Sequence, residues 1–222
     1  MKKLFLGLFL VLITSCSLGT IEDLRELVTN CLCTVNVNLE TLANKEKGSI
    51  KEFSFINSEL FDLGIPTEDF ALSSAILINN YFEIGSEQII KVNLVKDSGD
   101  MNKDTTTYTY EQSVIEEQSP KYFEIETIIN DFVKNIYQGN FYKCKMLTDI
   151  SATTEEFNLL MTKIFGSLEK GYINTKIFSY KVEEKVYHIY SGIFTENDIL
   201  KLFRMAFKET ENGLKIIAFE FY

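Results

Sequence analysis

The spacing of apolar residues changes along the chain, and this change is the strongest constraint on the fold. Between residues 123 and 140, apolar side chains recur three and four positions apart, as on one face of a helix. They are Ile125, Ile128, Ile129, Phe132, Val133 and Ile136. From Asn174 onward, apolar and polar residues alternate instead, which is typical of strands. We therefore expect helices followed by about four antiparallel strands, an α+β arrangement.

Short signals mark further elements in this half. Thr153 is followed three residues later by Glu156, a capping box that predicts the start of a helix. Asn212 and Gly213 predict a hairpin turn between two apolar runs, residues 201–209 and 214–222. Residues 199–208 also fit a helix. We favour a strand there because the final run needs a neighbouring strand.

The first half predicts a second, smaller α+β unit. Residues 31–113 contain two strand patterns, a helical pattern that Thr67 can cap, and two more strand patterns, in the order β-β-α-β-β. Residues 116–121 are polar and include Pro120, which favours a linker at residues 114–120. The second domain then covers residues 121–222. In each domain we expect helices packed on an antiparallel sheet.

The second domain resembles the nuclear-transport-factor-2-like family, which has a cystatin-like cone. The resemblance is carried by "YQGNFYKCKML", by "TTEEFNLLMTKIFGSLEKG" and by the closing "ENGLKIIAFEF", in which Leu214 replaces a common Trp. It implies a cone-like sheet wrapped on a long helix. In enzymes of this family the pocket usually holds an acid–base pair, commonly Asp with His or Tyr.

The N-terminus has the pattern of a secretory signal. Two lysines follow Met1, and residues 4–13 form an apolar run broken only by Gly7. As a helix, this run would span roughly 15 Å, about half of the ~30 Å hydrocarbon core of a bilayer. It is too short for a stable membrane span, so residues 1–15 are predicted to be a signal peptide.

Ile13-Thr14-Ser15-Cys16 resembles a bacterial lipobox. The resemblance implies a diacylglycerol on Cys16, cleavage before it, and acylation of the new N-terminus with a fatty acid such as palmitate. Two or three acyl chains anchor a protein stably in a lipid bilayer. Residues 16–30 would form a tether or a short helix that leads off the membrane. Because Ser17 permits onward sorting, we expect a bacterial envelope protein at the outer membrane. An ordinary secretory signal with an incidental cysteine is the alternative.

The charge of the chain restricts its partners. The formal net charge is −10 and no basic cluster is present, which argues against nucleic acid as a partner and against electrostatic docking on anionic lipid. Apolar residues make up 45% of the chain, enough to exclude a disordered protein.

The remaining cysteines are Cys31, Cys33 and Cys144. They do not predict a zinc site, because no second cysteine pair is present and His188 is the single histidine. We expect neither a metal nor a cofactor. In an oxidising envelope, Cys31 or Cys33 could pair with Cys144. We favour buried free thiols, since cysteine packs as a small apolar residue.

Signals of catalysis are weak. There is no phosphate loop, nucleophile elbow, paired-histidine helix or calcium loop. His188 shares a strand face with Val186 and Tyr190, and it is the one candidate for a general base in the cone pocket. No motif links a carboxylate to it, so we favour a protein that is not an enzyme.

Aromatic residues suggest where a ligand could bind. The candidates for an open cone are Phe141, Tyr142, Tyr172, Phe178 and Tyr180. Aromatic rings with polar tips suit a small amphipathic ligand, although the same residues could fill the cone as core. The leading hypothesis is a membrane-anchored envelope lipoprotein that binds a ligand or an envelope protein. The alternative is an enzyme that uses His188.

Overall fold

The computed structural model describes residues 18–37, 50–82, 88–97, 103–197 and 199–222, and only the backbone of residues 18–23. The predicted signal peptide and Cys16 lie outside these residues. In chain order, the first half contains α1 (Leu18–Cys31), β1 (Thr34–Val37), β2 (Ile50–Ile56), the 3-10 helix η1 (Glu59–Phe61), α3 (Thr67–Phe82), β3 (Ile89–Asp97) and β4 (Lys103–Glu111). The second half contains α4 (Gln112–Tyr137), α5 (Phe141–Met146), α6 (Thr154–Ser167), β5 (Tyr172–Glu183), β6 (Val186–Thr195), β7 (Leu200–Thr210) and β8 (Gly213–Phe221).

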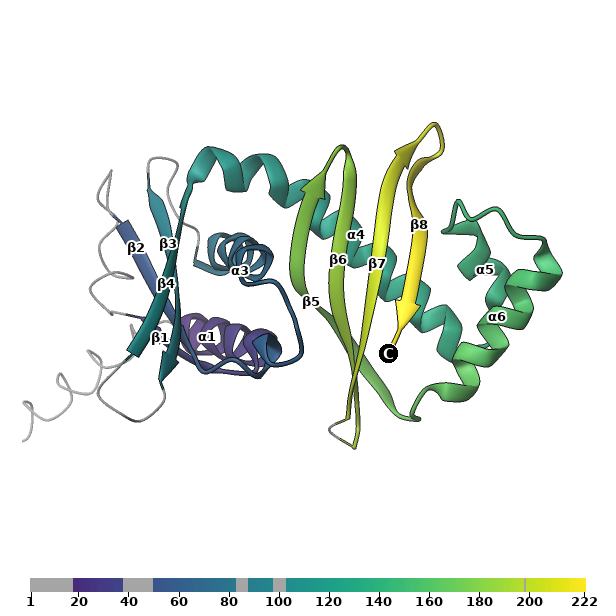
Figure 1. The fold of residues 1–222 in the computed structure, drawn as a ribbon, viewed down its shortest axis with the longest axis horizontal. Coiled ribbons are helices and arrows are strands. Elements are labelled where there is room, and N and C mark those ends of the chain that lie inside the picture. The colour runs from purple at the N-terminus through teal and green to yellow at the C-terminus, as the bar shows by residue number, and fades with distance from the viewer. Residues whose placement is uncertain (1–17, 38–49, 83–87, 98–102, 198) are drawn as a thin grey trace, which may run out of the picture.

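The α+β class is confirmed, in two parts that each hold a four-stranded sheet (Figure 1). The first sheet has the strand order β1-β2-β3-β4. One pairing in it differs from the prediction, because β2 and β3 are parallel. The physical reason is α3, which carries the chain back along the sheet between these two strands. A crossover of that kind permits parallel neighbours, whereas a short hairpin would require antiparallel ones.

The predicted linker at residues 114–120 is wrong. These residues lie inside α4, which continues directly from β4 and contains Pro120. Pro120 has no backbone N–H to donate, and the Ser119 hydroxyl donates to the carbonyl of Ile115 at 2.6 Å in the same turn. Neighbouring helical turns and buried residues such as Ile115 and Tyr122 outweigh the local signal of proline.

The second sheet is an antiparallel meander in the order β5-β6-β7-β8. Residues 200–210 form strand β7, as favoured from the sequence. The hairpin to β8 is present, with Thr210 paired to Gly213 and the turn at residues 211 and 212. Gly213 has a φ of +89°, a conformation that favours glycine. The capping box of Thr153 and Glu156 is also present, at the start of α6.

The two parts share one core. The buried apolar side chains of both halves form a single cluster. Helix α3 lies between the first sheet and β5 (Figure 1), and residues around its circumference are buried, among them Phe70, Ala71, Ala75 and Ile78. Helix α4 packs on the second sheet through contacts such as Phe132 with Phe219, whose ring centres are 5.2 Å apart. The side of the sheet that faces α4 is therefore filled by side chains.

Of the two alternatives for residues 16–30, a tether or a short helix, the structure shows a helix. Helix α1 packs against α3, β1 and β5 and does not lead away from the fold. Leu27 and Cys31 on α1 are buried, and Glu26 forms a 2.7 Å ion pair with Lys176 of β5. The apolar residues among residues 24–31 thus pack α1 against the rest of the fold. Within the part of the chain that the structure describes, no helix combines the length and apolarity needed to cross a membrane.

Candidate functional site

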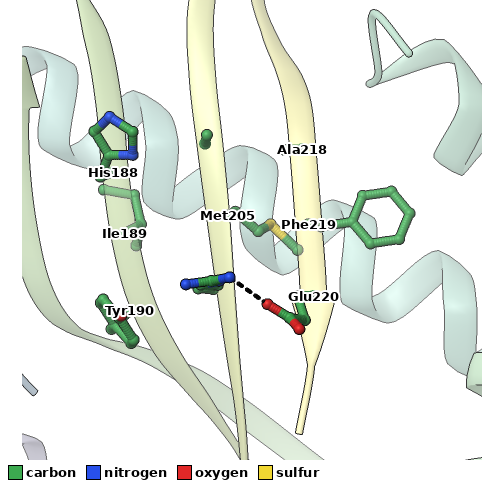
Figure 2. Close-up of a pocket in the computed structure, with 9 residues that line it drawn as sticks. His188, Ile189, Tyr190, Met205, Ala218, Phe219 and Glu220 are labelled. Atoms are coloured by element: carbon green, nitrogen blue, oxygen red, sulfur yellow. Dashed lines mark ion pairs between the residues drawn. The ribbon is translucent and has the colours of Figure 1, made fainter. Parts of the chain in front are cut away.

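A groove of about 620 Å³ lies on the open face of the second sheet, the face turned away from α4 (Figure 2). Its floor is formed by two small side chains, Ala206 of β7 and Ala218 of β8, which are paired across these strands. On its other side, Ala206 is paired with His188 of β6. Successive residues of a strand point to opposite faces. The side chains of the large neighbours Met205 and Phe219 therefore point toward α4, and they do not fill the groove.

One wall of the groove is a row of charged and aromatic side chains. Arg204 stands opposite Tyr190 on one side and Glu220 on the other. Its guanidinium lies 2.6 Å from the Glu220 carboxylate and 6.0 Å from the ring centre of Tyr222. The Tyr222 hydroxyl donates to Glu220 at 3.4 Å. Arg204 thus pairs with Glu220 and lies over the Tyr222 ring.

His188 lies at the other end of the groove, on the same face. Its imidazole is 45% exposed, and its Nε2 is 3.9 Å from a carboxylate oxygen of Glu183. Lys181, opposite His188 in the sheet, is 3.3 Å from the other oxygen of Glu183. Asp69 of α3 joins this charged group. Burial raises the pKa of Asp69, and Lys181 and His188 oppose that shift.

This charged group is open to water. The 3.9 Å between His188 and Glu183 exceeds the length of a hydrogen bond. Both side chains are about half exposed. The imidazole is therefore accessible to a polar group of a ligand. His188 lies on the open face of the second sheet. The predicted cone pocket would lie on the opposite face, which packs against α4 and is filled by side chains.

The five aromatic residues proposed from the sequence are not brought together. Phe178 and Tyr180 are buried in the core, and Tyr172 lies 5.0 Å from the ring of Tyr137. Phe141 contacts Phe165, while Tyr142 is 69% exposed on α5. None of the five lines the groove. Alternation along one strand cannot distinguish the filled face from the open one.

The alanines of the groove floor were not predicted, although the sequence pattern of β7 gives a weak indication of them. In "KLFRMAFKE" the odd-numbered Phe203, Met205 and Phe207 are large, whereas Ala206 is small on the alternate face. The hairpin register brings Ala218 next to it, after a one-residue shift near Phe207. A search for small residues paired across the predicted hairpin would have suggested the floor, but that shift hides the pairing.

The cysteines behave differently from the prediction. Cys31 and Cys33 form a disulfide with each other, so neither is a free thiol nor a partner of Cys144. Leu32 between them has a φ of +47°, a backbone shape that lets two cysteines so close in sequence meet. Cys144 is free and buried, and burial raises the pKa of its thiol to about 12.

A second hollow, of about 420 Å³, lies where β2 and β3 end. Asn57 closes the parallel pair there: its side chain donates to the carbonyl of Asp97 and accepts from the amide of Asp97. Asp62 and Asp104 also line this hollow. Among the described residues, however, no group of three or more acidic, cysteine or histidine side chains is arranged to hold a metal ion.

No protein-family model matches the chain, and no curated protein matches it either.

Proposed function

We propose that this protein is a lipid-anchored module of the bacterial envelope, held at the outer membrane by acylated Cys16, and that it binds a ligand without transforming it. The support for the anchor is the basic, apolar and lipobox-like order of residues 1–16. Helix α1 begins at Leu18, two residues after Cys16, and is docked on the fold. The anchor would therefore hold the folded part directly at the bilayer surface.

The groove on the second sheet carries the binding part of the proposal. Its alanine floor offers an apolar surface, while Arg204, Glu220 and His188 offer charged and hydrogen-bonding groups at its sides. A volume of about 620 Å³ suits a small molecule. The ligand class that fits is a small amphipathic molecule, with its apolar part on Ala206 and Ala218 and its polar part beside Arg204. The three helices followed by a four-stranded meander also support membership of the nuclear-transport-factor-2-like family as a proposal.

The anchor is tested by fractionation of the full chain expressed in a bacterium. Cys16→Ala should move the protein from membranes to the soluble fraction and abolish incorporation of labelled palmitate. Cys144→Ala is the matched control, because Cys144 is buried and far outside the lipobox. Membrane association and acyl labelling that persist in Cys16→Ala would disprove the anchor.

The groove is tested with anilinonaphthalene sulfonate, an aromatic probe with one anionic group. Ala218→Phe fills the floor and should weaken binding of the probe roughly tenfold, equivalent to about 1.4 kcal/mol. Ala218→Ser keeps the groove open and should bind like the parent protein. Equal binding by Ala218→Phe, with unchanged thermal stability, would place the probe elsewhere and reject the groove as the binding site.

A further inference from the structure

The two sheets have four edge strands, and three of them are protected against pairing with another chain. An edge strand exposes unpaired backbone groups, which short length, bulges or a covering element can block. Strand β1 has four residues. Strand β5 has two register shifts and packs against α3. Strand β8 has a shift, and Ile216 on its outer edge pairs with the backbone of Leu147 and Asp149.

In the part of the chain that the structure describes, the fourth edge, β4, has none of these protections. All nine of its residues pair with β3 in an unbroken antiparallel register, and the strand contains no proline. It is the last strand of the first sheet, at the opposite end from β1. Among the described residues, no backbone group bonds to its outer edge. Residues 105–110 are threonine and tyrosine only, residue types that favour strands and leave the edge uncharged.

Side-chain contacts hold β4 straight. On the inner face, the Tyr108 hydroxyl is 2.9 Å from that of Thr67, and the Tyr110 hydroxyl donates to the carbonyl of Glu68 at 3.3 Å. On the open face, Thr107 donates to Asn93 at 2.8 Å. The edge is therefore ordered before any partner arrives, which lowers the entropic cost of pairing.

The sequence of β4 is complementary to itself. In an antiparallel pair of two copies centred on Thr107, each residue faces the one equally distant on the other side of the centre. Lys103 then stands opposite Glu111 of the partner subunit, and Thr105 opposite Thr109 of the partner subunit. Opposite charges and paired threonines stabilise neighbouring strands. The two ends of the strand thus carry complementary charges, and its uncharged middle brings no like charges together.

We propose that β4 is an interface between two copies of this chain, which pair antiparallel about a two-fold axis at Thr107 and form one continuous eight-stranded sheet. Each copy presents the same patch, as a two-fold dimer requires. The interface lies on the first sheet and leaves the groove of the second sheet open, so it is independent of the proposed ligand.

Cross-linking at single cysteines tests the register in the full chain, in membranes, with a short bismaleimide. Thr107→Cys places two thiols across the axis and should give a dimer on a denaturing gel. Thr105→Cys should not, because its two copies are offset by four residues, about 13 Å along the strand. Thr109→Cys should behave like Thr105→Cys. Co-expression of differently tagged Thr105→Cys and Thr109→Cys should restore a mixed dimer.

Charge reversal provides a second measurement, by sedimentation of the purified full chain in detergent. Lys103→Glu or Glu111→Lys alone should weaken the dimer by roughly tenfold, since each change affects two symmetric pairs. The double variant should recover most of the loss. Lys103 also pairs with Asp97 within the chain at 3.0 Å. That contact is lost in Lys103→Glu and in the double variant alike, so the difference between them isolates the contact between copies.

The outcomes separate clearly. Selective cross-linking of Thr107→Cys together with recovery in the double variant supports the proposal. A monomeric parent protein, equal cross-linking at all three positions, or cross-linking only to a different protein overturns it.

Discussion

The two sheets have the same number of strands and each packs helices on one face, yet their open faces differ. On the first sheet, a polar ladder fills the open face: Asn93 donates to Glu52 at 2.6 Å and accepts from Thr107 at 2.8 Å. On the second sheet, Ala206 and Ala218 leave the open face hollow between longer side chains. A groove on a sheet thus arises where paired positions carry small residues.

A small residue in the second sheet does not always produce a hollow, as Gly192 shows. Gly192 lies on β6 beyond the groove, and a Cβ at that position would overlap the side chains of Phe178 and Leu200. The side chains of Phe178 and Leu200 occupy the space beside Gly192, so no hollow forms at this position. Ala206 and Ala218, in contrast, line the groove and form its floor.

The largest expected effect concerns the core that joins the two sheets. Phe132→Ala should destabilise the protein by about 3–5 kcal/mol, because it removes a fully buried ring of α4. Since the buried residues form one cluster, hydrogen exchange should accelerate in β2–β3 as well as in β6–β7. Loss of protection confined to β6–β7 would show that the two sheets unfold independently.

The next effect separates the two open faces. Asn93→Ala should cost about 1.5–3 kcal/mol, because it removes hydrogen bonds on a largely buried side chain, one of them to a carboxylate. Ala206→Ser, at the groove floor, should change stability by less than about 0.5 kcal/mol. Denaturant midpoints of both variants provide the measurement. Similar costs for both would mean that the groove floor is packed as tightly as the ladder.

A smaller effect is expected at the junction of α3 and α4. The Ser73 hydroxyl donates to the hydroxyl of Tyr122 at 3.2 Å, and both side chains are buried. Tyr122→Phe should therefore cost about 1 kcal/mol in the free energy of unfolding. Ser73→Ala combined with Tyr122→Phe removes both partners and should cost less than the sum of the single variants. Simple additivity in this double-mutant cycle would contradict a direct bond.

The smallest effect is a change in pH dependence. Burial raises the pKa of Glu126 above its ordinary value of 4.5, and Lys176 opposes this shift. The folded state therefore holds the proton to higher pH, and this stabilising contribution declines as pH rises from 4.5 through the folded-state pKa. Glu126→Gln should be more stable than the parent above that window and similar below it.

Glu156 is the matched control for this titration. Its hydrogen bonds with Thr153 lower its pKa, so its contribution to stability is present above the unfolded-state pKa and is lost as pH falls through the folded-state pKa. Glu156→Gln should accordingly lose stability at neutral pH. Urea unfolding measured across the acid range distinguishes the two variants, and parallel pH profiles would contradict the assigned burial of Glu126.

Local patterns predicted much of the fold because they depend on neighbours in the chain. The helical spacing of Ile125, Ile129 and Phe132 places one face of α4 against the core, and these residues are buried. The capping box at Thr153 and the strand at residues 200–210 follow from turn and cap residues in the same way. Pro120 misled the domain boundary, since tertiary packing can retain a proline inside a long helix.

Other features depend on contacts between distant residues. The amphipathic stretch of α1 looked like a tether because its docking partner, Lys176 on β5, lies far along the chain. The pairing of Cys31 with Cys33 requires a positive φ at Leu32, which residue spacing does not reveal. His188 was singled out as the one histidine, but its neighbours Ala206 and Ala218 became visible only through the register of three strands.

The sequence by itself determined the α+β class and most helices and strands of the second half, because periodicity, caps and turns depend on residues adjacent in the chain. Only the tertiary structure decided that β2 and β3 are parallel, which face of the second sheet is hollow, and that β4 is an edge strand of the first sheet. These features depend on which side chains meet across strands, and that choice is made by the free energy of burying both halves in one core.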